Sequence, residues 1–231
     1  MVLAVFIEFV NYREWTESLG KDREWFIQLT QSKVYQVIQV FASSHGGIAL
    51  PLRYDYQVIL LPYEVDVRGF NEGLKKALLG YAPTPINTLV ACRKIRDLLK
   101  MNLNHESYSD EVSCVPESLV VAHADLNDFT RKTKSLGIYK TYSEVLNVVS
   151  HYVKELEDIA IVQYLGGDNI VSICDEDSMH KVLEVLESIN SIKVGVGVSK
   201  IPRKAFMLAA EALDIIREKG KVSKYLILYD R

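Results

Sequence analysis

Cysteine, long apolar runs and net charge are all scarce in this sequence. The three cysteines are odd in number and far apart, so we expect no disulfide framework and a reducing, cytoplasmic compartment. No stretch approaches the roughly 18 consecutive apolar residues of a membrane helix, so we expect no membrane partner. A formal net charge of −3 provides no broad basic field, which argues against a nucleic-acid partner.

The familiar spacings of metal ligands are also missing. The chain has no CxxC, HxxxH or HxE, so only a zinc site assembled from distant residues stays open. What is present is an ordinary globular composition, with 48% hydrophobic and 25% charged residues, which excludes disordered and fibrous classes. A length of 231 residues suits one large domain or two small ones, at roughly 150 residues per domain.

Strand and helix patterns follow one another in the same order twice along the chain. Each half reads strand, helix, strand, strand, helix, strand, helix, and the polar, aperiodic stretch Asn102–Val112 separates the halves as a linker. The predicted strands are Leu3–Phe9, Ile48–Tyr54, Gln57–Leu61, Ile86–Cys92, Leu119–Ala124, Ala160–Leu165, Ile170–Cys174, Ile192–Val198 and Val222–Tyr229. The predicted helices are one that contains Trp25–Phe41 and stops at Gly46-Gly47, and others at about Val67–Leu79, Arg93–Lys100, Thr141–Ile159, Ser178–Ile189 and Pro202–Lys219.

The repeated order indicates an internal duplication of the split β-α-β, ferredoxin-like unit. We predict an α+β protein of two modules, residues 1–110 and 111–231, each an antiparallel sheet with helices on one face. Asp55 and Asp168 would then occupy matching hairpin turns. A single larger mixed sheet is the alternative.

Two carboxylates are the clearest candidates for a site. Asp125 ends the first strand of the second module in AHADLNDFT, and Asp168 lies in the hairpin YLGGDN. In a ferredoxin-like sheet the hairpin tip lies beside the end of that strand, so the carboxylates should meet, and they repel unless a cation separates them. Mg²⁺ accepts one or two carboxylates and completes its shell with water and phosphate oxygens. We therefore predict that Asp125 and Asp168 are catalytic metal ligands.

Neighbouring residues extend this candidate site. Gly166 and Gly167 would give the hairpin conformational freedom and leave room for a ligand beside Asn169, although a plain surface turn has the same composition. His123 leaves its strand on the same face as Asp125, which suits a general acid or base. A histidine in an apolar strand is more often a hydrogen-bonded core residue, so both interpretations stay open.

Basic residues near two helix starts suggest a phosphate. Lys200 and Arg203 stand at the start of the last helix, and the basic run 131–134 follows Asp125. A helix N-terminus carries partial positive charge, so cations there indicate a bound anion such as a triphosphate. A solvated charged surface is the alternative. The predicted substrate contacts are Leu126, Asn127, Asp128, Phe129, Gly166, Gly167, Asn169, Lys200 and Arg203.

Together these residues resemble a known family. A carboxylate closing the first strand and a GGD(N/E) hairpin are typical of the palm domains of GGDEF proteins, class III nucleotidyl cyclases and polymerases. More narrowly, AHADLNDFT, YLGGDN and VGVGVSKIPRKAFMLAAEALDIIREKG resemble archaeal GTP cyclohydrolase III, as do NYREWT and RYDY in the first half. The resemblance spans nearly the whole chain.

The resemblance implies a Mg²⁺-dependent hydrolase that opens the imidazole ring of GTP and cleaves its phosphoanhydride. The product would be a formylamino-pyrimidine ribosylamino 5′-phosphate, an early intermediate for riboflavin-type and deazaflavin cofactors. Activation by K⁺ and assembly as a homo-oligomer, a dimer or a tetramer, are further expectations from the family.

The first module departs from the family pattern. The resemblance requires an aspartate where Val10 stands, Glu8 lies two residues earlier, and RYDY around Asp55 lacks glycines. We interpret the first module as a degenerate copy without a metal of its own. Two alternatives to the enzyme stay open: a non-catalytic GTP-sensing regulatory module, and a GGDEF- or cyclase-like nucleotidyl transferase. The intact Asp125, Asp168 and Lys200 favour the enzyme, because a sensor could lose a metal ligand freely.

Overall fold

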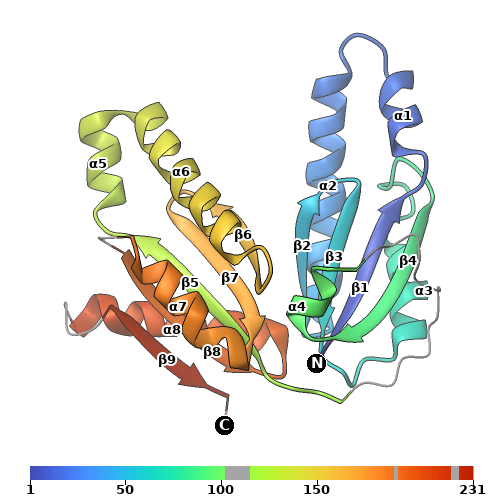
Figure 1. The fold of residues 1–231 in the computed structure, drawn as a ribbon. Coiled ribbons are helices and arrows are strands. Elements are labelled where there is room, and N and C mark those ends of the chain that lie inside the picture. Colours follow the sequence, from blue (N-terminus) through green and yellow to red (C-terminus); the bar gives the residue numbers. More distant parts are fainter. Residues whose placement is uncertain (102–114, 190–191, 220–223, 231) are drawn as a thin grey trace. The chain divides into compact units, whose positions relative to one another are not determined.

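The structure, a computed structural model, describes residues 1–101, 115–189, 192–219 and 224–230. They form two compact units of mixed α and β structure, which confirms the predicted α+β class (Figure 1). The first unit is built from Val2–Arg93, and the second from Glu117 onward together with Lys94–Met101. The predicted linker Asn102–Val112 lies outside the described residues. No helix in the described part of the chain is long and apolar enough to span a membrane.

The first unit is a four-stranded sheet covered on one face by helices. Its elements are β1 (Val2–Phe9), α1 (Tyr12–Ser18), α2 (Arg23–Ser44), β2 (Ile48–Arg53), β3 (Tyr56–Leu61), α3 (Val67–Ala77) and β4 (Ile86–Arg93). The strand order is β2-β3-β1-β4, and each neighbouring pair is antiparallel. Alternate residues of β1, such as Val5 and Ile7, pack in one core with Ile38 of α2 and Leu74 of α3, because every second side chain of a strand points to the same face.

The second unit is a five-stranded sheet with β5 in its centre. Its elements are α4 (Ile95–Leu98), β5 (Leu119–Leu126), α5 (Phe129–Leu136), α6 (Ile138–Leu156), β6 (Ala160–Gly166), β7 (Asn169–Asp175), a 3-10 turn (Glu176–Ser178), α7 (Met179–Glu187), β8 (Ile192–Ser199), α8 (Pro202–Lys219) and β9 (Tyr225–Tyr229). The order is β6-β7-β5-β8-β9, in which β9 pairs with β8 in parallel and the other pairs are antiparallel.

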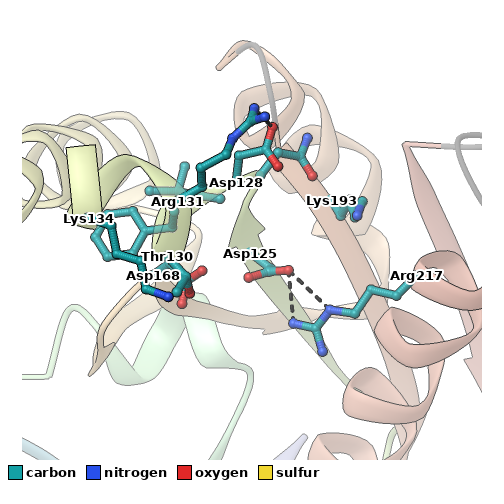
Figure 2. A pocket seen from close by; sticks show the side chains of 11 residues that line it. Asp125, Asp128, Thr130, Arg131, Lys134, Asp168, Lys193 and Arg217 are labelled. Atoms are coloured by element: carbon teal, nitrogen blue, oxygen red, sulfur yellow. Dashed lines mark hydrogen bonds and ion pairs between the residues drawn. The ribbon is translucent and has the colours of Figure 1, made fainter. Parts of the chain in front are cut away.

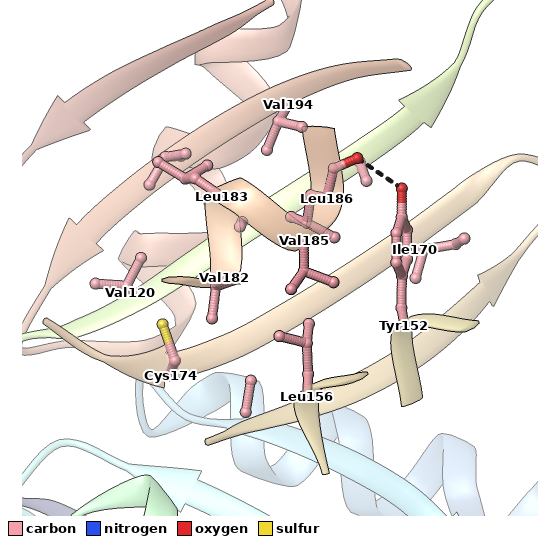
Figure 3. Close-up of a cluster of buried hydrophobic side chains, with 14 of the residues drawn as sticks. Val120, Tyr152, Leu156, Ile170, Cys174, Val182, Leu183, Val185, Leu186 and Val194 are labelled. Carbon is pink, nitrogen blue, oxygen red and sulfur yellow. Dashed lines mark hydrogen bonds between the residues drawn. The ribbon is translucent and has the colours of Figure 1, made fainter. Parts of the chain in front are cut away.

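One face of this sheet packs on α6 and α7 (Figure 3). Ala122 and Ala124 of β5 belong to this core, as do Leu156 of α6 and Leu186 of α7. Tyr152 is fully buried there, and its hydroxyl donates to the Leu186 carbonyl at 3.0 Å. Burial raises the pKa of Tyr152, so the phenol stays neutral and the hydrogen bond satisfies the group that burial would otherwise penalise.

The opposite face packs on α8, so the second unit differs in this detail from the predicted arrangement of helices on one face. Gly195 and Gly197 of β8 allow this packing. A Cβ on Gly197 would lie 2.0 Å from the Ala205 carbonyl oxygen, and one on Gly195 would lie 2.1 Å from the Ala209 carbonyl oxygen. The helix therefore touches the strand backbone directly, with only small residues between them.

Lys94–Met101 is the other difference from the predicted arrangement, which assigned these residues to the first module. The Asp175 carboxylate at the end of β7 accepts hydrogen bonds from the backbone N–H groups of Ile95, at 2.9 Å, and Arg96, at 3.3 Å. These bonds satisfy donors that the start of α4 leaves free. Asp177 adds ion pairs to Lys94, at 2.9 Å, and to Arg96. The segment is therefore tied to the second unit.

The described cysteines depart from expectation in one respect. Cys174 is a free, buried thiol in the second unit, whereas Cys92 in β4 is disulfide-bonded. The prediction of no disulfide framework therefore missed this bond. An odd number of widely spaced cysteines cannot show which of them approach each other in the fold.

The close contact between α8 and β8 predicts sensitivity to a single methyl group. Gly197→Ala should lower the free energy of unfolding by about 1–3 kcal/mol, because the added Cβ has no space against the helix backbone. Urea unfolding followed by circular dichroism measures this. Ala210→Leu, on the exposed side of α8, is the control and should stay within about 0.5 kcal/mol of the parent. Equal stability of the two variants would contradict the contact.

Candidate functional site

A pocket of about 490 Å³ opens in the second unit at the end of β5 (Figure 2). Residues from β5, the loop after it, α5, the β6–β7 hairpin, β8 and α8 contribute to it. They are Asp125, Leu126, Asn127, Asp128, Phe129, Thr130, Arg131, Lys134, Asp168, Lys193 and Arg217. Acidic and basic side chains therefore share one small volume.

The two predicted carboxylates lie together in this pocket. Asp125 pairs across the sheet with Asn169, the residue after Asp168, so the hairpin carries Asp168 to the end of β5. Burial raises the pKa of Asp168, the neighbouring Asp125 carboxylate raises it further, and Arg217 opposes both effects. Asp125 itself is only 7% exposed. A cation between such carboxylates would relieve their repulsion.

The β6–β7 hairpin has the conformation that its glycines suggested. Gly166 and Gly167 have φ values of 100° and 62°, in the region that favours glycine. The Asn169 amide nitrogen donates to Asp168 Oδ1 at 3.2 Å. Gly166, Gly167 and Asn169 thus shape the turn that presents Asp168, and none of the three is a pocket-lining residue.

His123 stands behind the pocket. Its Nε2 donates to Asn169 Oδ1 at 3.0 Å, so the hydrogen-bond chain runs from His123 through Asn169 to Asp168. Burial lowers the pKa of His123, while the bond to Asn169 and the charge of Asp125 act in the opposite direction. His123 does not line the pocket, which suits a residue that positions Asp168 through Asn169.

Lys200 and Arg203 lie at the wrong end of the sheet for the predicted phosphate contact. In the antiparallel pairing of β5 with β8, Asp125 faces Lys193, whereas Leu119 faces Ser199. Six residues of β5 separate these two positions, or roughly 20 Å at about 3.3 Å per residue. The structure therefore contradicts a contact between Lys200 or Arg203 and a ligand in this pocket. The prediction considered charge at the helix start but not the direction of β8.

Other cations do line the pocket. Arg131 pairs with Asp128 at 2.8 Å, and Arg217 pairs with Asp125 at 2.9 Å. Lys134 and Lys193 form no ion pair within the described ranges of the chain. Lys193 could have been found from the sequence by pairing the two strands in antiparallel register. Arg217 lies 92 residues from Asp125, and only the packing of α8 brings it there.

The start of α5 adds uncapped backbone donors. Asp128, the residue before the helix, has φ of 60°, an unusual value outside glycine, and no side chain caps the helix. Asn127 Oδ1 is buried and has no hydrogen-bond partner in the described part of the chain. A helix N-terminus with free N–H groups and nearby lysines is a favourable anion site.

The donor set fits Mg²⁺ with a polyphosphate better than zinc. Among the residues described, no group of three or more His, Cys, Asp or Glu side chains could enclose a metal. Mg²⁺ needs fewer protein ligands, because one or two carboxylates hold it while water and phosphate oxygens complete its shell. Asp125 and Asp168 are two such carboxylates, and Lys134 and Lys193 place positive charge in the same pocket.

Comparison with known proteins identifies the family of this chain. Residues 2–230 match the GTP cyclohydrolase III family. The chain belongs to this family. A GTP cyclohydrolase III from Aeropyrum pernix is 36% identical over 222 residues, covering 92% of this chain and 91% of that protein. One from Sulfurisphaera tokodaii is 35% identical over 212 residues, covering 91% and 92%.

Solved structures add little to this assignment. A bacterial light-regulated adenylyl cyclase has 12% sequence identity and a TM-score of 0.44, with 98% of this chain and 85% of that chain covered. A TM-score this low does not bear on function.

In the first unit of this GTP cyclohydrolase III family member, Glu8 and Asp55 stand at the positions of Asp125 and Asp168. Glu8 pairs with Tyr56 as Asp125 pairs with Asn169, so Glu8 is the counterpart of Asp125 in the register. The Glu8 carboxylate accepts from the Tyr56 hydroxyl at 2.8 Å, and Asp55 pairs with Arg53 at 2.7 Å.

Register also corrects the alignment behind the Val10 prediction. Asn11, with φ of 56°, precedes α1 as Asp128 precedes α5, so Val10 matches Asn127 and not the carboxylate position. The shared positive φ at Asn11 and Asp128, at the same place in each unit, is the kind of local detail that an internal duplication would preserve.

Lys193→Ala tests which end of β8 binds phosphate. The variant should bind inorganic tripolyphosphate, in the presence of Mg²⁺, roughly tenfold more weakly than the parent, because a charge-assisted contact is lost. Isothermal titration calorimetry measures the affinity. Lys200→Ala is the matched control at the other end of the same strand and should bind as the parent does. A larger loss in Lys200→Ala would move the phosphate site to the opposite edge of the sheet.

Proposed function

We propose that this chain is a GTP cyclohydrolase III that hydrolyses GTP with Mg²⁺ in the pocket at Asp125 and Asp168. The reaction opens the imidazole ring and cleaves the phosphoanhydride, giving 2-amino-5-formylamino-6-(5-phosphoribosylamino)pyrimidin-4(3H)-one with release of phosphate. The observation that carries the proposal is the carboxylate pair beside two lysines without ion pairs of their own in the described chain, within a family whose curated relatives carry that name.

Each part of the pocket has a role in binding the triphosphate. Bound Mg²⁺ would activate water and neutralise charge that develops on the phosphates. Asp125 and Asp168 would hold it through their carboxylate oxygens. Lys134 and Lys193 would bind phosphate oxygens, together with the free N–H groups at the start of α5. These contacts would hold the triphosphate and orient the purine ring for reaction.

His123 would act as a positioning residue in this scheme. Because its Nε2 donates to Asn169, whose amide donates to Asp168, His123 holds the hairpin carboxylate in place for the metal. Its lowered pKa favours the neutral imidazole at pH 7, which can donate this bond without adding charge next to the metal.

Assembly and activation are the less direct parts of the proposal. Several apolar side chains of α6 are exposed, namely Ile138, Tyr139, Tyr142, Leu146 and Val153. An exposed apolar patch of this kind supports the homo-oligomer expected from the family resemblance. Activation by K⁺ stays a prediction from the same resemblance.

Loss of either metal-binding carboxylate should abolish turnover. Asp125→Asn and Asp168→Asn should each retain less than about a tenth of the parent rate at saturating Mg²⁺, because the charge that holds the ion is gone. Purine absorbance and free phosphate, followed together, measure both steps. Asp230→Asn, which removes the partner of Lys204 at the far edge of the sheet, is the control.

The form of failure distinguishes the alternatives. Binding of GTP without turnover by the parent protein would indicate a regulatory sensor. Release of pyrophosphate with the purine intact would indicate nucleotidyl transfer. A rate above a tenth of the parent in either aspartate variant would remove these residues from the metal site.

The first unit should tolerate loss of its hairpin aspartate. Asp55→Asn should leave the rate within about threefold of the parent, because Asp55 is paired with Arg53, and Glu8, the counterpart of Asp125, is hydrogen-bonded to Tyr56. Steady-state kinetics with GTP measures this, and urea unfolding checks that the fold is intact. An inactive but folded Asp55→Asn protein would show that the first unit contains a site of its own.

A further inference from the structure

Arg217 makes a contact that binding of a triphosphate does not by itself explain. Its Nη2 and Nε donate to Asp125 Oδ2 at 2.9 Å and 3.3 Å (Figure 2). Its Nη1 donates to Asp214 Oδ1 at 3.1 Å. The residue reaches the pocket from α8, on the side of the sheet opposite α6 and α7. A carboxylate suited to a metal is thus already paired with a side-chain cation.

The surroundings make this pair stronger than a surface ion pair. The Asp125 side chain is 11% exposed, so water screens its charge poorly, and the second carboxylate of Asp168 lies next to it. Without a nearby positive charge the two carboxylates would repel each other. Arg217 provides one positive charge on Oδ2, whereas a divalent ion would provide two.

We propose that Arg217 is a placeholder cation, which neutralises Asp125 when the metal is absent and moves to the phosphates when metal and nucleotide bind. The inference rests on the proposed function of the pocket. A divalent ion competes with the guanidinium for Asp125 because it carries twice the charge. Once displaced, Arg217 keeps its ion pair with Asp214, which is 68% exposed and therefore holds it weakly.

Phosphate is the suitable second partner for the displaced guanidinium. The planar guanidinium presents several N–H donors in a fork that matches two phosphate oxygens, which an ammonium group cannot do. Arg217 already lines the pocket in which Lys134 and Lys193 would bind the same phosphates. A rotation of the Arg217 side chain is therefore enough to bring its guanidinium to the phosphates.

Opposite effects on two ligands distinguish this role from simple phosphate binding. Removing a placeholder should tighten binding of the metal alone, because the competitor is gone. The same change should weaken binding of the nucleotide, because a phosphate contact is lost. Lys193 is the matched control: it has the same charge and lines the same pocket, but it makes no ion pair with Asp125.

The test uses the full chain with two probes. Mn²⁺ binding without nucleotide, measured by electron paramagnetic resonance, should be roughly 3- to 10-fold tighter in Arg217→Gln and within about twofold of the parent in Lys193→Gln. Binding of a β,γ-imido GTP analogue with Mg²⁺, measured by calorimetry, should be at least roughly tenfold weaker in Arg217→Gln. Arg217→Lys keeps the charge without the fork, so metal binding should match the parent while the analogue binds more weakly.

Several results would overturn the inference. Weaker Mn²⁺ binding in Arg217→Gln would mean that Arg217 only orients Asp125 for the metal. Equal tightening in Arg217→Gln and Lys193→Gln would mean that the general field of the pocket acts and not a specific competition. Unchanged analogue binding in Arg217→Gln would remove the phosphate contact. If the parent binds neither Mn²⁺ nor the analogue, the proposed function fails together with the inference. If the parent binds both and a variant gives one of the results above, only the inference fails.

Discussion

The direct contact between α8 and β8 determines the geometry of the candidate site. Gly195 and Gly197 have no side chains, so the helix lies against the strand backbone and its register along the strand is set. Two residues of a strand span about 6.6 Å, and four residues of a helix span about 6 Å. Every second residue of β8 can therefore contact every fourth residue of α8. The helix positions that follow the strand in this way are Ala205, Ala209, Leu213 and Arg217.

The contact between α8 and β8 also places Arg217 next to Asp125. Gly197 meets the start of α8 at Ala205, and Arg217, further along the same helix, reaches the end of β5. A larger side chain at either glycine would push the helix away and shift Arg217 as well. The ion pair between Arg217 and Asp125 therefore depends on the packing of α8 against β8, although the residues involved are far apart in sequence.

The two faces of β5 have different roles: one contributes to the hydrophobic core and the other carries the polar residues at the pocket. Ala122 and Ala124 point into the core beneath α6 and α7, while His123 and Asp125 lie on the face that α8 covers. Alternation along a strand makes this division automatic, since neighbouring side chains leave on opposite faces. His123 and Asp125 can thus be polar without weakening the core, because the core face of β5 holds apolar side chains.

Local patterns in the sequence predicted most of the strands and the meeting of the two aspartates. Asp125 and Asp168 follow from topology alone, because a ferredoxin-like sheet places a hairpin tip beside the end of its first strand. The helices α1 and α5 were missed, since each is short and follows a residue with positive φ, a conformation that sequence periodicity does not show. Arg217 was missed because nothing local indicates which face of the sheet α8 covers.

The prediction for Lys200 and Arg203 failed for a different reason. Lys200 and Lys193 stand at the two ends of one strand, and charge alone does not distinguish them. Strand direction does, since antiparallel pairing with β5 puts Lys193 next to Asp125. The physical information was present in the predicted topology, but it was applied to the carboxylates and not to the lysines.

The capping of α4 by Asp175 has a consequence for how the chain folds during synthesis. The segment Lys94–Met101 leaves the ribosome before any strand of the second unit, and the carboxylate that satisfies its N–H groups follows about 80 residues later. At about 5–20 residues per second, α4 waits several seconds for its partner. The boundary between the two units is therefore not a single point in the sequence. The second unit includes residues that are synthesised directly after the first.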